Sequence, residues 1–237
     1  PSSPPLPARR PSLARLCEIM AAHSRSIPFE NLDVVLGKTI SMREGDVHAK
    51  LVGARRGGYC FEQNTLLRHA LVALGYGVRP LLCRVRWGKT PAQLSTFTHM
   101  ALAVRVQPED ADDDAATTAA AAAAEFLVDV GFAGTNSIAP CRLGTRAPQT
   151  LPEGQFRVVD GVDHIGLPQP PRRRGRGVGG SGSGGGGGGG GGEYTALQML
   201  KRGEWTCLYV FRSAETAIDP DLEMSNWISC TGPSSRF

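Results

Sequence analysis

Arg56-Gly57-Gly58-Tyr59-Cys60-Phe61-Glu62-Gln63-Asn64 is the stretch of this chain that says most about its fold. Two glycines stand just before a cysteine, and after the cysteine apolar residues recur with a spacing close to the helical period. Gly75 and Gly77 then interrupt the apolar run, as glycines do where a helix ends. The pattern predicts a helix that begins at Cys60 and ends shortly before Gly75.

Cys60 therefore stands at the predicted N-terminus of a helix. Unpaired N–H groups and the helix macrodipole favour negative charge at such a position. A thiol there loses its proton more easily and becomes a nucleophile. A small, buried, unreactive cysteine at a helix start is the alternative interpretation. The stretch by itself leaves both interpretations open.

The overall composition indicates a globular protein. The chain has 237 residues, of which 41% are hydrophobic and 20% charged, and this is enough for one large domain or two small ones. No apolar run approaches the roughly 20 residues that a membrane-spanning helix needs, so no membrane partner is expected. The net charge of +4 suits an anionic small ligand and is too diffuse to predict binding to nucleic acid.

The six cysteines are widely spaced and include no C-x-x-C pair. This spacing is typical neither of a dense disulfide framework nor of a zinc site. Asp160, Asp163 and His164 come close together, but without a further ligand cluster solvated turn residues are the better interpretation. We therefore predict a reduced protein of the cytoplasm that holds no metal. Because the first residue is Pro1 rather than Met, we expect a fragment or a processed product.

The residues before the quoted stretch predict a helical region. Residues 1–11 are rich in proline and are expected to be disordered. Ser12 is a suitable N-cap for a helix over residues 13–23. Pro28 ends helical structure because it biases the residue before it away from the α region. Glu30 is charged among apolar neighbours, and such a residue usually needs a partner.

Three strand-like runs follow the predicted helix, over residues 80–87, 98–106 and 125–132. In each run apolar residues alternate with other residues, as in a strand that has one buried face. His99 lies opposite the apolar row of the second run, and Asp129 lies opposite that of the third. If these two strands pair side by side, His99 and Asp129 meet on one face of the sheet.

The remaining pattern predicts more strands and a closing helix. A strand is expected at residues 155–160, and a hairpin at residues 194–199 and 205–212, although the first arm of the hairpin also suits a helix. An Asp-Pro pair opens a short helix over residues 219–227, because Pro is favoured in the first helical turn.

Two low-complexity segments, residues 107–124 and 168–192, interrupt this pattern, and we interpret both as insertions. The first is acidic and then alanine-rich, with no apolar face to bury. The second holds arginines typical of a solvated loop, and its Gly175-x-Gly177-x-x-Gly180 matches a dinucleotide-binding fingerprint. We reject that match because no strand precedes it and no helix follows it.

Cys60, His99 and Asp129 together form a candidate nucleophilic triad. A thiol must lose its proton to act as a nucleophile, so a base has to lie within hydrogen-bond reach. A carboxylate holds the imidazole of such a base in the correct tautomer and stabilises its cationic form. The chain has five histidines and many carboxylates, so spacing alone does not establish the triad.

Five motifs of this chain resemble those of the arylamine N-acetyltransferases, and they occur in the family's order. They are Arg56-Gly57-Gly58-Tyr59-Cys60-x-Glu62-x-Asn64, Thr98-His99-Met100, Leu127-Val128-Asp129-Val130-Gly131-Phe132, Ile27-Pro28-Phe29-Glu30-Asn31-Leu32-Asp33 and the closing Thr231-x-Pro233-x-Ser235-x-Phe237. The resemblance extends from about residue 12 to residue 237, apart from the two insertions.

The resemblance implies an α+β fold in three parts. A helical N-terminal domain at residues 12–78 would carry the nucleophile, and a β-barrel-like domain at residues 79–212 would contain the insertions 107–124 and 168–192. Residues 213–237 would begin an α/β lid domain that is truncated in this chain. The three candidate catalytic residues would form a core similar to that of the cysteine proteases.

The resemblance also implies transfer of an acetyl group from acetyl-CoA to an arylamine or a hydrazine by a ping-pong route, an activity of xenobiotic metabolism. Cys60 would be acetylated and CoA released, and the amine would then take the acetyl group. His99 would be the base, and Asp129 would orient it. The implied partners are CoA and a small aromatic amine or hydrazine, with no metal and no nucleic acid.

Further roles follow from the resemblance, residue by residue. Phe29 and Phe132 would line the acceptor pocket, where an aromatic amine can stack. Arg56 would pair with Glu30 and hold the nucleophile loop against the first domain; the alternative is a surface ion pair that contributes little. The residues implied to lie near the cofactor are Ser95, Thr96, Thr231 and Ser235.

The chain also departs from the family's pattern. Cys230 stands where the family has a serine, and the first insertion lengthens the separation between His99 and Asp129. The family continues beyond the closing motif, so much of the third domain is expected to be missing. Three alternatives stay open: an amide synthase of the same fold that moves a larger acyl group, a cysteine hydrolase with the same triad, and an inactive truncated family member.

Overall fold

The computed structural model describes residues 10–90, 92–93, 95–107, 123–134, 138–162 and 194–232. Helices come first: α1 (Leu13–Ser26), α2 (Leu32–Val35), α3 (Glu44–His48), a π-helical turn (Ala49–Gly53) and α4 (Cys60–Ala73). Strands follow, and α6 (Asp219–Thr231) comes last. The strands are β1 (Gly77–Val85), β2 (Phe97–Val106), β3 (Ala124–Val128), β4 (Cys141–Arg142), β5 (Gln149–Leu151), β6 (Gly154–Val162), β7 (Tyr194–Lys201) and β8 (Glu204–Phe211).

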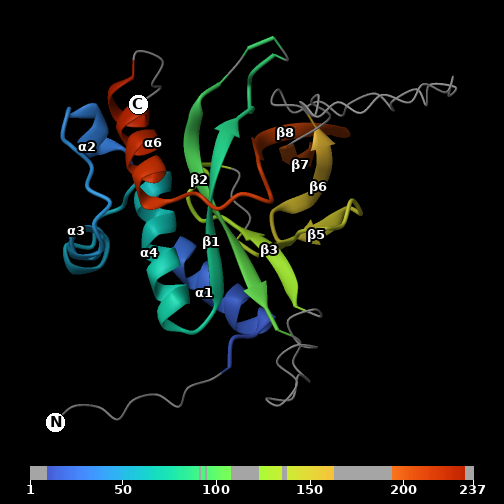
Figure 1. Cartoon of the computed structure of the whole chain (residues 1–237), viewed down its shortest axis with the longest axis horizontal. Coiled ribbons are helices and arrows are strands. Elements are labelled where there is room, and N and C mark those ends of the chain that lie inside the picture. The colour runs from blue at the N-terminus through green and yellow to red at the C-terminus, as the bar shows by residue number, and fades with distance from the viewer. Residues whose placement is uncertain are drawn as a thin grey trace, which may run out of the picture.

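The described strands form one antiparallel sheet in the order β4-β3-β2-β1-β8-β7-β6-β5. Its two end strands lie beside each other, because the Gln149 side chain of β5 hydrogen-bonds the backbone N–H and C=O of Arg142 in β4, at 2.7 and 2.9 Å. The sheet thus curls into a nearly closed barrel, with α4 and α6 beside β1 and β2 (Figure 1). This arrangement agrees with the predicted helical part followed by a barrel-like sheet.

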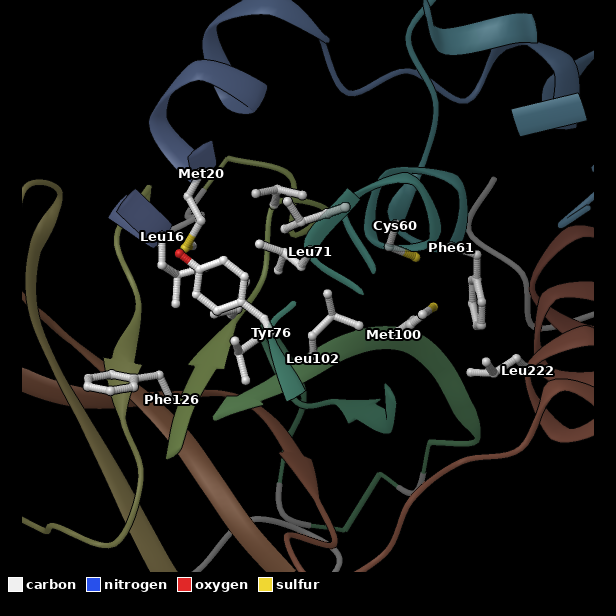
Figure 2. Packing of buried hydrophobic residues seen from close by; sticks show 14 of the residues in the cluster. Leu16, Met20, Cys60, Phe61, Leu71, Tyr76, Met100, Leu102, Phe126 and Leu222 are labelled. Carbon is white, nitrogen blue, oxygen red and sulfur yellow. The ribbon is translucent and has the colours of Figure 1, made fainter. Parts of the chain in front are cut away.

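Two apolar clusters occupy the two faces of the central strands. The helix-side cluster joins the helices to β2 and includes Leu16, Met20, Phe61, Leu71, Met100, Leu102 and Leu222 (Figure 2). The barrel-side cluster fills the inside of the sheet and includes Leu81, Cys83, Leu127, Phe132, Phe156, Tyr209 and Phe211. Because α1, α4, β2 and α6 share one cluster, packing is continuous across the predicted domain boundaries, and the division into three domains stays a prediction.

The helix predicted at Cys60 starts at that residue in the structure. The first helix, α1, ends at Ser26 rather than near His23, because a further backbone hydrogen bond, from Ile27 to His23, closes one more turn before Pro28. The last helix, α6, runs to Thr231 rather than residue 227. These differences lie at helix ends, where a periodic pattern is least informative.

The predicted strands are present, with shifted ends. The first strand, β1, begins three residues early, at Gly77, because this residue pairs with Arg105 of β2. β3 ends at Val128 rather than residue 132, because the Asp129 side chain accepts a hydrogen bond from the Gly131 N–H at 2.9 Å and turns the chain. The run at residues 194–201, which also suited a helix, is the strand β7.

The first predicted insertion lies mostly outside the described residues, and the second lies wholly outside them, as do Asp163, His164 and Ser235. Their flanking residues are informative, however. Val106 pairs with Ala124, so the first segment joins neighbouring ends of β2 and β3 and stops one residue earlier than predicted. Val162 pairs with Tyr194, so the second segment joins neighbouring ends of β6 and β7 in the same way.

Three further observations concern the described part of the chain. None of its helices is long and apolar enough to cross a membrane. Within it, no group of three or more His, Cys, Asp or Glu side chains is arranged to hold a metal ion. The six cysteines are free thiols, and Cys60 is among them.

Two adjacent residues of α4 test the helix-side cluster. Leu71 is fully buried and Val72 is 54% exposed. We expect Leu71→Ala to lower the free energy of unfolding by about 2–5 kcal/mol, because it removes buried methyl groups and leaves a cavity. The matched control, Val72→Ala, should change it by no more than about 0.5 kcal/mol. Urea denaturation measures both values, and equal losses would contradict the packing described.

Candidate active site

Cys60 is the first residue of α4 and is almost completely buried, with 3% of its surface exposed. Its Sγ lies 3.8 Å from the carbonyl oxygen of Thr98, which is in β2. In Figure 2 its side chain leaves the first turn of the helix close to Met100. The thiol therefore stands where α4 meets the beginning of β2.

His99 in β2 and Asp129 just after β3 lie side by side. Nε2 of His99 is 2.7 Å from Oδ2 of Asp129. The two strands are antiparallel neighbours, with Leu102 opposite Val128, so His99 and Asp129 project from the same face of the sheet. The structure thus brings together the two residues that the strand pattern placed on one face.

The Cys60 thiol also acts on the His99 ring, since it contributes to the raised pKa of His99. Nε2 of the ring bonds to Asp129, so Nδ1 is the ring nitrogen that the carboxylate does not take. The three predicted triad residues are therefore contiguous, in the order thiol, imidazole, carboxylate. This is the order that proton transfer from a thiol requires.

Burial and charge act in opposite directions on this pair. Burial disfavours the charged imidazole, but the negative charge of Asp129 and its hydrogen bond outweigh burial and raise the pKa of His99 to about 10. Burial also disfavours the carboxylate, yet His99 and the hydrogen bonds from Asn64 and Gly131 lower the pKa of Asp129. The two groups thus form an imidazolium–carboxylate pair across the neutral range.

Asn64 links the three segments that carry the triad. Its Nδ2 donates to Oδ1 of Asp129 at 3.0 Å and to the carbonyl oxygen of Met100 at 2.8 Å. Its Oδ1 accepts a hydrogen bond from the Val130 N–H at 3.2 Å. Sequence reasoning assigned Asn64 no role. Its place in the Cys60 motif is the one signal by which it could have been found.

Gly131 allows the turn after β3 to lie directly on α4. Its N–H donates to Oδ1 of Asp129 at 2.9 Å. A Cβ at this position would lie 2.6 Å from Cα of Cys60 and 2.8 Å from Nδ2 of Asn64, which is closer than real side chains approach. Only glycine leaves room for this contact.

Aromatic rings enclose His99 on the barrel side. The ring centroids of Phe132 and Tyr209 lie 5.1 and 5.0 Å from that of His99, and Trp87 stacks on Phe132 at 5.8 Å. Strict alternation had placed Phe132 in the row of Val128; that placement is wrong, because β3 ends before Phe132 and its ring joins the barrel-side cluster. Sequence reasoning also missed Tyr209, which comes from a distant strand.

The two phenylalanines predicted to line the acceptor pocket lie in different surroundings. Phe29 forms a parallel backbone bridge with Gly58 and packs against the helix-side cluster. Phe132 lies in the barrel-side cluster. Gly57 permits the approach of the Phe29 segment, because a Cβ there would lie 2.2 Å from the carbonyl oxygen of Pro28. Their joint contact with an acceptor stays a prediction.

Arg56 and Glu30 form the ion pair that the resemblance implied. Nη2 and Nε of Arg56 donate to Oε1 of Glu30 at 2.6 and 3.1 Å. Asp33 lies 3.4 Å from the same guanidinium, and Lys50 joins Asp33 to Glu62 of α4 at 2.8 Å each. These charges connect the loop before Cys60 to the segment after α1, although the 39% exposure of the Arg56 side chain weakens the pair by solvent screening.

The residues implied to lie near the cofactor are dispersed. Thr96 lines a cavity of about 430 Å³ between β1, β2 and α6. The Ser95 hydroxyl donates to the carbonyl oxygen of Val85 at 2.9 Å. The Thr231 hydroxyl donates to a carbonyl oxygen one turn earlier in α6, at 2.8 Å. Ser235 lies outside the described residues, so the four are not seen to form one site.

Known proteins are similar to this chain in sequence. A family model described as N-acetyltransferase matches residues 12–172. An arylamine N-acetyltransferase of Mycolicibacterium smegmatis is 35% identical over 231 residues, which are 96% of this chain and 68% of that protein. The chain belongs to the arylamine N-acetyltransferase family. The family member of Mycobacterium tuberculosis strain H37Rv is 34% identical over 97% of this chain and 66% of its own length.

Solved structures of arylamine N-acetyltransferases share the fold. A structure of the M. smegmatis protein has a TM-score of 0.73 and 34% identity, over 96% of this chain and 68% of that one. The M. marinum protein in complex with CoA has a TM-score of 0.73 and 32% identity, over 95% of this chain and 68% of that one. The chain spans about two thirds of the length of these relatives, and 66% of the length of the M. tuberculosis protein.

Gly131→Ala tests the close approach of the turn to α4. We expect the substitution to lower the free energy of unfolding by about 1–3 kcal/mol, because the added methyl group overlaps Cα of Cys60. Gly45→Ala in α3 is the matched control, since its backbone is helical and nothing lies within 4 Å of the point that its added methyl group would occupy. Urea denaturation of both variants decides the matter; a Gly131→Ala protein as stable as the parent would refute the contact.

An NMR titration tests the electrostatics of His99. Its folded pKa of about 10 lies above the ordinary value of 6.5, so the ring should stay protonated from pH 6.5 to pH 9. The stability that this group contributes is full below pH 6.5 and is lost as the pH rises through about 10. Asp129→Asn removes the largest influences that oppose burial, so the pKa of His99 should fall well below that of the parent. An unchanged titration in that variant would contradict the assigned cause.

Proposed function

We propose that this chain transfers an acetyl group from acetyl-CoA to an arylamine or a hydrazine by a ping-pong mechanism. One observation carries the proposal. A free, buried thiol at the start of α4 adjoins an imidazole that is itself bonded to a carboxylate at 2.7 Å. The family membership supports the same chemistry, as does the relative whose structure is described as a complex with CoA.

In the first half-reaction Cys60 is the nucleophile. The His99–Asp129 pair stabilises the deprotonated thiol as a thiolate–imidazolium pair. The sulfur of Cys60 attacks the carbonyl carbon of the thioester, a new S–C bond forms, and the S–C bond to CoA breaks. His99 donates its proton to the departing sulfur, so CoA leaves as a thiol and Cys60 stays acetylated.

In the second half-reaction His99 acts as a base. The amine nitrogen of the acceptor attacks the acetyl carbonyl carbon on Cys60, and His99 takes the proton that the nitrogen loses. The N–C bond forms, the S–C bond to Cys60 breaks, and the thiolate–imidazolium pair is restored. Asp129 holds the ring orientation throughout, which is the role of the carboxylate in such triads.

The surroundings of His99 suit these substrates. Phe132 and Tyr209 pack around the ring and exclude water on the barrel side, which protects an acetyl-cysteine from hydrolysis. Phe29 and Phe132 are proposed as acceptor contacts. The cavity lined by Thr96 supports that residue as a contact of the acyl donor, and Ser95, Thr231 and Ser235 stay proposed contacts with it.

We also propose the wider setting of the reaction. The six free cysteines suit a reducing compartment such as the cytoplasm, and amine acetylation there fits xenobiotic metabolism. Residues 12–78 and 79–212 are proposed as the first two domains, with residues 213–237 as the start of a lid domain. No metal or nucleic acid takes part in the proposed reaction.

Intact-protein mass spectrometry tests this function. After incubation with acetyl-CoA, we expect the chain to gain one acetyl group, because the thiol adjoins its base. Cys60→Ala should gain none. His99→Ala and Asp129→Ala should each slow the gain by about 10²–10⁴-fold, since both remove parts of the acid–base machinery. Cys17→Ala, a change in α1 on a half-buried cysteine, is the control and should load as fast as the parent.

The same experiment separates the alternatives. A folded chain that gains no acetyl group would sink the proposal and favour an inactive family member. An amide synthase would load longer acyl thioesters faster than acetyl-CoA. A hydrolase would consume the thioester at an undiminished rate whether or not an amine is added, and would form no N-acetyl product.

A further inference from the structure

Asn226, in the middle of α6, connects this late helix to the loop that carries the nucleophile. The Tyr59 hydroxyl donates a hydrogen bond to Oδ1 of Asn226, and Nδ2 of Asn226 donates to the carbonyl oxygen of Ile40 at 3.0 Å. Tyr59 is fully buried, and Asn226 is 7% exposed. The oxygen and the nitrogen of the carboxamide thus both form hydrogen bonds, in a buried place where water does not compete for them. We call these three residues the α6 clasp.

Tyr59 is the residue directly before Cys60, and its backbone is fixed as well. Its N–H donates to Oε2 of Glu62 at 3.1 Å, and its C=O accepts a hydrogen bond from the Gln63 N–H at 2.9 Å. The backbone bonds set the start of α4. The clasp adds a side-chain hydrogen bond that leads from this start directly to α6, through the phenol.

The partners of Cys60 are held by other groups. Asp129 is fixed by His99, Asn64 and Gly131, and α6 takes no part in those bonds. Loss of the clasp would therefore shift the nucleophile while its base stays in place. A displacement of about 1 Å between reacting groups is enough to slow a reaction by about 10²-fold.

Cys230 lies one turn after Asn226 and touches the same hydroxyl. Its Sγ is 3.5 Å from the Tyr59 hydroxyl and 3.8 Å from Oδ1 of Asn226. Burial raises the pKa of the Cys230 thiol and that of the Tyr59 phenol. Both groups therefore keep their protons near neutral pH, and the phenol remains a hydrogen-bond donor to Asn226.

We propose that Asn226 is a positioning residue for the nucleophile: through the Tyr59 hydroxyl it fixes Cys60 relative to His99. The expected effect on acetyl transfer rests on the proposed function; the positioning of Cys60 does not. It assigns to α6 a part in the reaction of Cys60, in addition to its packing against the helix-side cluster.

Tyr59→Phe, Asn226→Ala and the double variant test the proposal. Tyr76→Phe is the matched control, because Tyr76 is also a buried tyrosine, 4% exposed, whose hydroxyl donates to the carbonyl oxygen of Ser12 at 2.9 Å, at the other end of α4. Two rates are measured at Cys60 at a temperature well below each variant's Tm: acetylation by acetyl-CoA, and alkylation by iodoacetamide, located by peptide mass. The Tm of each variant is measured in parallel.

Each clasp variant should lower the acetylation rate at saturating acetyl-CoA about tenfold, and the double variant should lose no more than the worse single variant, since both changes break one connection. Tyr76→Phe should lower the Tm and leave both rates unchanged. The His99 ring should stay protonated at neutral pH in all four variants, because its bond to Asp129 is untouched. Clasp variants that lower the Tm but react at the parental rate would overturn the proposal, as would a double variant whose loss is the product of the single losses.

The alkylation measurement distinguishes failure of this proposal from failure of the proposed function. If the parent chain is not acetylated, alkylation still reports the position of Cys60, because iodoacetamide needs no acyl donor: the thiolate forms an S–C bond and iodide leaves. A lower alkylation rate in the clasp variants then supports the positioning role on its own. An unchanged alkylation rate overturns it.

Discussion

The Asn64 carboxamide is the interaction on which the arrangement of the site depends. It is buried, and it joins the N-terminal part of α4 to β2 and to the turn after β3, through Met100, Asp129 and Val130. A buried polar group that loses its partner costs about 1–3 kcal/mol, so removing this side chain would leave several groups unsatisfied together. Gly131 completes the contact because it brings the turn within reach of Asn64. The distance between thiol and imidazole therefore follows from how a helix and two strands are fastened to one another.

A buried ion pair usually stabilises a protein little, because removing two charges from water offsets their attraction. The pair of His99 and Asp129 is retained here because each oxygen of the carboxylate has hydrogen-bond donors and the imidazole faces a thiol. Phe132 and Tyr209 keep water away, and in such surroundings charges act on one another more strongly than in water. The site thus contains an ion pair that is unfavourable to bury, and the rest of the fold holds it in place, as is common at reactive sites.

Much of this arrangement was predictable from local patterns. The start of α4 at Cys60 followed from a glycine pair and a helical period, and the meeting of His99 with Asp129 followed from alternation in two strands that pair. What could not be predicted depends on distant parts of the chain. Tyr209 and Asn226 reach the site from β8 and α6, and no short window of sequence shows those contacts. The early end of β3 was missed for a related reason, because a side chain and a neighbouring N–H, not propensity, end the strand.

The two long segments between paired strand ends have a consequence for how this sequence can change. The segment after Val106 returns to the sheet at Ala124, directly opposite its point of departure, and the segment after Val162 returns opposite itself at Tyr194. The entropic penalty for closing a loop grows slowly, by about 0.6 kcal/mol for each doubling of its length. Residues can therefore be gained or lost at these two points while the strand register stays the same. Such positions are natural places for lineages to diverge in length, and for an experimenter to graft a tag or a second domain.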